Sequence, residues 1–228
     1  MANFNFFNEL AETSFVSNSQ NYLKPYDVYK VKLTKMERST LNKKDGTATY
    51  NTIALEFTGD DGIFQQNIFI PDENNEKDFE RRENEKSHKL MASRFDQYKY
   101  TLMQIVEAVN PKGAENIKAN GSKLEKVEKP IALFTDMILK AAAAGKNTEV
   151  YLKLVGQNTD GRIFARLPNA CLIGNDGKPA ALNFINADKN KLRFSNYEIT
   201  EMNKYKSAAP TPIEEEKTDE FNLDDLEV

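Results

Sequence analysis

Three stretches of alternating apolar and polar side chains constrain the fold of this chain more than any other feature. They cover residues 26–39, 49–59 and 63–70, and the turn-forming runs Asp45-Gly46 and Asp60-Asp61-Gly62 lie between them. Alternation with a period of two places one face of a strand in the core and the other in solvent. Asp-Gly pairs between such stretches favour tight hairpin turns. The sequence therefore predicts a three-stranded antiparallel meander.

The middle of the chain has the periodicity of helices. Apolar residues recur every three or four positions from Phe95 to Val109, which predicts a helix that begins at about Ser87. A second helix is predicted over residues 130–147, and the lysine-rich residues 112–129 are expected to connect the two. Helices therefore interrupt the strands.

Alternation returns after the second helix. Residues 149–156 and 162–167 are predicted to form two further strands joined by a turn, and short apolar segments after them are expected to add one or two edge strands. The chain is thus expected to be mainly β with an α insertion, an α+β protein. The predicted parts are an N-terminal arm (1–25), one domain (26–205) with a helical insertion (72–145), and a disordered acidic tail (206–228).

Charge is distributed unevenly along the chain. The last fifteen residues, from Glu214, contain eight acidic residues and one lysine, a net charge of −7, whereas the whole chain carries −4. Residues 1–213 are therefore mildly basic, at +3. A run of like charges repels itself and has little apolar surface to bury, so we predict that it is disordered. A partner-binding peptide, an internal competitor for a nucleic-acid groove and a solubilising terminus are all open interpretations.

The residues that the chain lacks argue against several function classes. With one histidine, His88, and one cysteine, Cys171, a zinc site is nearly excluded and no internal disulfide can form. No phosphate-binding glycine loop, dinucleotide fingerprint or nucleophile elbow occurs. We therefore predict no enzymatic activity, no cofactor and no metal. The N-terminus lacks signal-peptide features and no apolar run is long enough to cross a membrane, so a cytoplasmic location is expected.

Basic and aromatic side chains alternate on the strand faces expected to point away from the core. Cations neutralise phosphates, and flat rings stack on unpaired bases at roughly 1–3 kcal/mol each. The run Arg162-x-Phe164-x-Arg166 is the sharpest case, because period two puts its three side chains on one face. For any single strand, an ordinary solvated face is the alternative. The predicted nucleic-acid-binding residues are Lys30, Lys32, Tyr50, Tyr151, Lys153, Arg162, Phe164 and Arg166.

In the order of its elements the chain resembles the single-stranded DNA-binding proteins of bacteriophages. The resemblance covers residues 26–70, 149–170 and 214–228, and includes the opening MANFNF and the segment before LEFTGDDG. It implies the OB-fold, a five-stranded barrel that often carries a helix between its third and fourth strands. The tail departs from that group, because Phe221 lies seven residues from the end instead of at the end.

The resemblance implies a protein that coats single-stranded DNA without sequence preference during phage replication or recombination, in the cytoplasm of an infected bacterial cell. Its tail would recruit replication or recombination proteins, and a homo-oligomer is compatible with this function. Two alternatives stay open: a phage structural or assembly protein, and an accessory enzyme or mediator of nucleic-acid metabolism. The tail residues expected to bind a partner are Glu214, Glu215, Glu216, Asp219, Glu220, Phe221, Leu223, Asp224, Asp225 and Leu226.

Overall fold

A computed structural model describes residues 21–42, 46, 49–85, 88–124, 127–159, 162–168, 173–174, 177 and 183–208. Residues 209–228, Cys171 and most of the predicted N-terminal arm lie outside these residues. The strands are β1 (Asp27–Asn42), β2 (Thr49–Gly59), β3 (Gly62–Phe69), β4 (Glu149–Thr159), β5 (Arg162–Arg166) and β6 (Ile185–Asn186). The helices are η1 (Glu76–Asp78), α2 (Arg94–Val109), α3 (Pro111–Ala119), α4 (Gly121–Leu124), α5 (Pro130–Ala144), η2 (Lys189–Lys191) and α6 (Asn196–Ala208).

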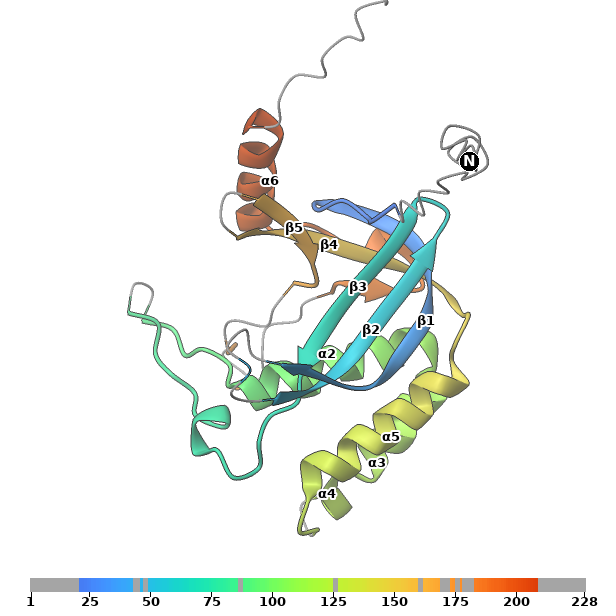
Figure 1. Cartoon of the computed structure of the whole chain (residues 1–228), viewed down its shortest axis with the longest axis vertical. Helices are drawn as coiled ribbons and strands as arrows, with labels where there is room; N and C mark the ends of the chain where they lie inside the picture. The colour runs from blue at the N-terminus through green and yellow to red at the C-terminus, as the bar shows by residue number, and fades with distance from the viewer. Residues whose placement is uncertain are drawn as a thin grey trace, which may run out of the picture.

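The strands form one open antiparallel sheet. Its order is β3-β2-β1-β4-β5, and β6 pairs with β4. Helices α2 to α5 gather toward one end of the sheet and α6 lies toward the other (Figure 1). The predicted α+β class is therefore confirmed, and the described strands make an open sheet and not a closed barrel.

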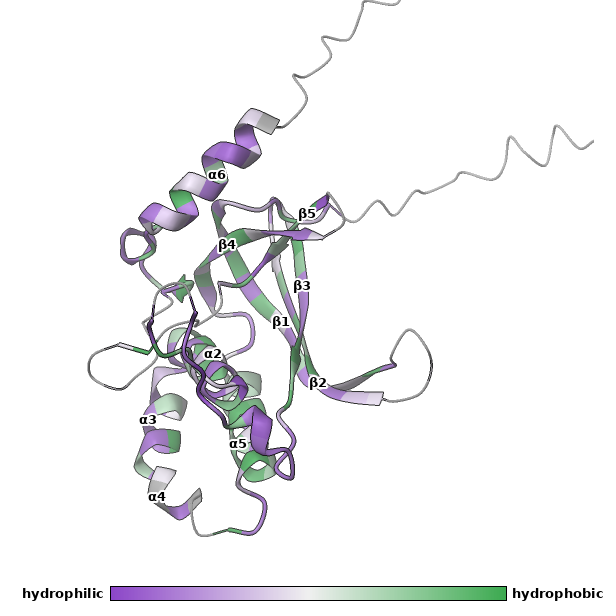
Figure 2. Ribbon diagram, turned by 90° about the vertical axis from the view of Figure 1, so that its left-hand side faces the viewer, coloured by the Kyte–Doolittle hydropathy of each residue, from purple (hydrophilic) through white to green (hydrophobic). Residues whose placement is uncertain are grey.

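The meander predicted over residues 26–70 is confirmed, and its register defines two faces. Leu33 pairs with Phe57, and Phe57 pairs with Phe64; all three are at most 3% exposed. Paired residues lie on the same face of a sheet. These three residues mark what we call the inner face, and Lys32, opposite Thr58, lies on the outer face. Hydrophilic and hydrophobic bands alternate along β1 and β4 (Figure 2).

The residues just before β1 pack on the sheet instead of leaving it. Leu23 is buried, and its backbone N–H donates to the carbonyl of Ile63 at 2.9 Å. Gly62 has a φ of +139°, and a Cβ built there would lie 2.1 Å from the carbonyl oxygen of Asn21. Only glycine allows this close approach of two backbones. The domain therefore begins before the predicted boundary at residue 25.

Two helix boundaries differ from those expected. Helix α2 begins at Arg94 and not near Ser87, because Ser93 and Asp96 form a reciprocal capping box. Pro111 ends α2 as expected but also begins α3, inside the predicted connector. Proline is favoured at the first helical position because its missing N–H would have no helical partner there.

The end of the domain has less strand than expected and a helix that was not expected. Of the predicted edge segments, the described residues contain strand only at Ile185–Asn186. Helix α6 was not predicted and extends three residues into the predicted tail, to Ala208. It has few apolar residues, and none of them is fully buried in the described structure. His88, expected on a helix, lies in a loop with a φ of +51°.

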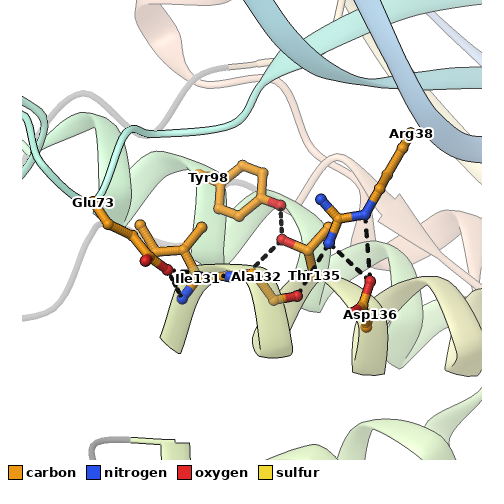
Figure 3. Close-up of polar contacts among 7 residues, drawn as sticks. All are labelled: Arg38, Glu73, Tyr98, Ile131, Ala132, Thr135 and Asp136. Carbon is orange, nitrogen blue, oxygen red and sulfur yellow. Dashed lines mark hydrogen bonds and ion pairs between the residues drawn. The ribbon is translucent and has the colours of Figure 1, made fainter. Parts of the chain in front are cut away.

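The helical insertion is tied to the sheet by polar contacts around α5 (Figure 3). A carboxylate oxygen of Glu73 accepts the backbone N–H groups of Ile131 and Ala132 at 2.7 and 3.2 Å. From β1, Arg38 donates to the carbonyl of Ala132 at 3.1 Å and to Asp136 at 2.8 Å. The loop after β3 and the strand β1 thus hold the same turn of α5.

A buried hydroxyl pair joins α2 to α5 in the same region (Figure 3). Thr135 donates to the carbonyl of Ile131 at 2.6 Å, and so the hydroxyl of Tyr98 donates to Thr135, also at 2.6 Å. Burial raises the pKa of Tyr98 to about 12, which keeps the phenol protonated as a donor. The two helices therefore pack as one unit against the inner face.

Candidate nucleic-acid interface

Strand pairing places the run from Arg162 to Arg166 on the outer face. Arg162, Phe164 and Arg166 lie opposite Thr159, Gln157 and Val155. Further along β4 the same face carries Tyr151, which pairs with Lys30 of β1. Three strands thus contribute basic and aromatic residues to the outer face.

These side chains differ in their access to solvent. The ring of Phe164 is 53% exposed and Arg162 is exposed. Arg166 is half-buried, and its Nε has no hydrogen-bond partner among the described residues. Near it, the side chain of Tyr26 lies against Gly156, where a Cβ would be 2.5 Å from the ring. Arg162 and Phe164 are therefore the most accessible residues of β5 for a ligand.

Two lysines of β1 share one carboxylate. Lys30 Nζ lies 3.0 Å from Glu149 and Lys32 Nζ lies 3.8 Å from it, and all three side chains are about half exposed. The hydrogen bond and charge of Glu149 raise the pKa of Lys30, and Lys30 in turn lowers the pKa of Glu149. This triad carries a net charge of +1, so the lysines are only partly neutralised. Exposed pairs of this kind are weak and can exchange partners.

Lys153 does not belong to the exposed surface, which corrects its predicted role. Its side chain is 3% exposed, and Nζ donates to both oxygens of Glu198 at 3.1 Å and to the carbonyl of Arg193 at 3.0 Å. The ammonium also lies 5.3 Å from the centroid of Phe194. Helix α6 and the segment before it cover this position of β4. Lys153 is therefore a structural cation that holds α6.

A pair of aromatic rings stands at the far end of the outer face. Tyr50 was predicted to contribute and is 44% exposed; its ring packs edge-on against Phe69, with centroids 5.4 Å apart. Phe69 is 56% exposed, whereas Phe64 is buried in the core. The sequence allowed only one of these two phenylalanines on the outer face. The two phenylalanines are an odd number of residues apart, and side chains at odd spacing point to opposite faces of a strand.

The rest of the outer face is mixed in charge. On β1, Lys35 pairs with Glu37 at 3.0 Å. On β2, Glu56 accepts from Gln65 and Thr34, and these hydrogen bonds lower its pKa. The excess of cations therefore lies on β1 and β5, near Lys30 and Arg162.

The described residues include no helix with the length and apolarity to cross a membrane, and no group of three or more potential metal ligands. The chain matches no protein-family model, no curated protein and no solved structure.

Proposed function

We propose that this protein binds single-stranded DNA without sequence preference through the outer face of its sheet, during phage replication or recombination. The observation that carries the proposal is the alignment of Arg162, Phe164 and Arg166 with Tyr151 and Lys30 on one face. Cations at this spacing neutralise phosphates, and exposed rings between them stack on bases of any identity.

We further propose that the sheet is a partly open relative of the OB-fold barrel. Its five main strands pair in the order β3-β2-β1-β4-β5, and the helical insertion lies between β3 and β4. The two edge strands, β3 and β5, approach each other. The backbone N–H of Leu167, just after β5, donates to the side chain of Gln66 on β3 at 2.9 Å. OB-folds are five-stranded, often partly open, and bind oligonucleotides on an exposed sheet face.

The charge of the face sets the expected strength of the salt dependence. The triad of Lys30, Lys32 and Glu149 counts as one net positive charge. Together with Arg162 and Arg166, the triad can neutralise about three phosphates. For a single strand, log K should then fall with log salt concentration with a slope of about −2. This is a modest slope, so stacking must supply much of the affinity.

The test is fluorescence anisotropy of a labelled oligo-dT over a salt series. The wild-type chain should bind in a salt-sensitive way, and Phe164→Ala should weaken binding roughly 5- to 100-fold without changing the slope. Tyr197→Ala is the matched control, because this ring is 75% exposed but stands on α6. Lack of binding by the wild type at low salt would refute the proposal, and large DNA-free oligomers would then favour an assembly protein.

The second half of the proposal concerns residues 214–228, the acidic part of the tail. Its acidic and apolar side chains, among them Phe221, suit docking on a basic and apolar groove of a replication or recombination protein. The same charges make it a competitor for the outer face. Truncation of the chain after Ala208 tests the competition between the tail and DNA.

A further inference from the structure

A second set of aromatic and basic side chains lies off the sheet, where the loop after β3 packs on the start of α2. The ring centroids of Phe79 and Phe95 are 5.2 Å apart, and Phe79 is 42% exposed. Lys99 Nζ lies 5.2 Å from the ring centroids of both Phe95 and Tyr100. We call Phe79, Phe95, Lys99 and Tyr100 the α2 aromatic cluster.

Two buried aspartates hold this cluster in place. Asp96 accepts two hydrogen bonds from Arg81, at 2.7 and 3.0 Å. Asp78 accepts from Arg94 at 3.0 Å and from the backbone N–H of Asp72 at 2.9 Å. Burial raises the pKa of Asp96, but the hydrogen bonds from Arg81 and Ser93 outweigh it and lower the pKa overall. A loop with few apolar residues is thereby fixed by ion pairs.

The charges of the cluster suit base stacking better than phosphate binding. Arg81 and Arg94 are each paired with an aspartate. Lys99 forms no ion pair with a carboxylate of the described residues, and it faces two rings instead. An exposed ring beside one cation offers a π-face to an unpaired base and little neutralisation of the backbone.

The cluster lies close to the end of β3, where the outer face of the sheet ends. Phe69, at the end of β3, is three residues before Asp72, which bonds to Asp78, and Phe79 follows directly. From backbone dimensions the Cα atoms of Phe69 and Phe79 are within roughly 20 Å of each other. The end of β3 and the start of α2 lie on the same side of the molecule (Figure 1).

We propose that single-stranded DNA on the outer face continues past Tyr50 and Phe69 onto the α2 aromatic cluster, where a base stacks on Phe79. The helical insertion then lengthens the DNA path instead of covering it. This inference rests on the proposed function, and it adds a binding surface of distinct chemistry: stacking with almost no salt dependence.

The test compares oligo-dT of about 8 nucleotides, which the sheet face alone can hold, with oligo-dT of about 25 nucleotides. Phe79→Ala should bind the longer probe roughly 5- to 100-fold more weakly, bind the shorter probe as the wild type does, and occlude fewer nucleotides of poly-dT per protein. Phe79→Leu, which keeps apolar packing on Phe95, should show the same loss, and Phe79→Tyr should retain binding.

Leu90→Ala is the matched control, because Leu90 lies in the same insertion, is also 42% exposed and has no ring. It should bind both probes as the wild type does. If Phe79→Leu binds the longer probe and occludes poly-dT like the wild type, the inference is overturned while the proposed function stands. If the wild type binds neither probe, both fail.

Discussion

Lys153 and Arg162 occupy the same face of neighbouring strands, yet only Arg162 is available to a ligand. Period-two alternation gives the face of a residue and nothing about what lies over that face. In the structure, Glu198 of α6 binds the ammonium of Lys153, while Arg162 stays exposed. The same pattern of lysine and arginine therefore yields one structural cation and one candidate phosphate contact.

This contrast predicts opposite phenotypes for two substitutions. Arg162→Ala should flatten the salt slope of DNA binding by about 0.7, the value for one phosphate contact on a single strand. Lys153→Met should leave the slope unchanged but lower the free energy of unfolding by about 3 kcal/mol, because Glu198 is left nearly buried and unpaired. Anisotropy over a salt series and urea unfolding measure the two effects. A change in the salt slope of DNA binding for Lys153→Met would show that Lys153 contacts DNA.

At the scale of elements, helix α5 depends on a cap from a distant segment. Its N-cap residue, Lys129, makes no capping hydrogen bond with its side chain. Glu73 supplies the acceptor, and its negative charge also suits the positive end of the helix dipole. The cap ties the loop after β3 to the insertion, and so it helps to fix where the α2 aromatic cluster lies relative to Phe69.

Removing this cap should destabilise the protein without touching the outer face. Glu73→Ala should lower the free energy of unfolding by about 1–2 kcal/mol, and Glu73→Gln by less, since the amide oxygen can still accept. Glu76→Ala, at an exposed neighbouring acid, should change stability by no more than about 0.5 kcal/mol. Urea unfolding measures all three. Equal stability of Glu73→Ala and the wild type would show that solvent satisfies these N–H groups equally well.

At the scale of the whole molecule, charge is divided between a mildly basic body and an acidic C-terminus. Residues 214–228 carry −7, and residues 1–213 carry +3. The last described helix, α6, ends at Ala208 after covering part of β4 through Lys153 and Glu198. The acidic residues therefore begin six positions after an element that is docked beside the candidate interface.

Removing residues 209–228 should tighten DNA binding. We expect an increase of about tenfold at low salt that disappears as salt screens the tail, because exposed charges interact over roughly 10 Å at 0.1 M ionic strength. A full-length chain with the eight acidic residues of the tail replaced by their amides is the control and should behave like the truncation. Binding that is identical with and without the tail at all salt concentrations would leave partner recruitment as the only role proposed for it.

Local patterns in the sequence predict the strands of the meander, their faces and the two long helices. These features depend on local patterns: alternation assigns Phe57 to the core and Tyr50 to the outer face, and helical spacing assigns Leu102 to the core. The same alternation places Phe164 on the outer face.

Contacts between distant segments set which outer-face residues are accessible and how the insertion is attached. Lys153 meets Glu198 from 45 positions away, and Glu73 meets Ile131 from 58 positions away. Such pairings leave no local pattern in the chain, because each partner alone looks like an ordinary solvated charge. Their existence depends on which segments the core brings together, and that is a property of packing among all the elements at once.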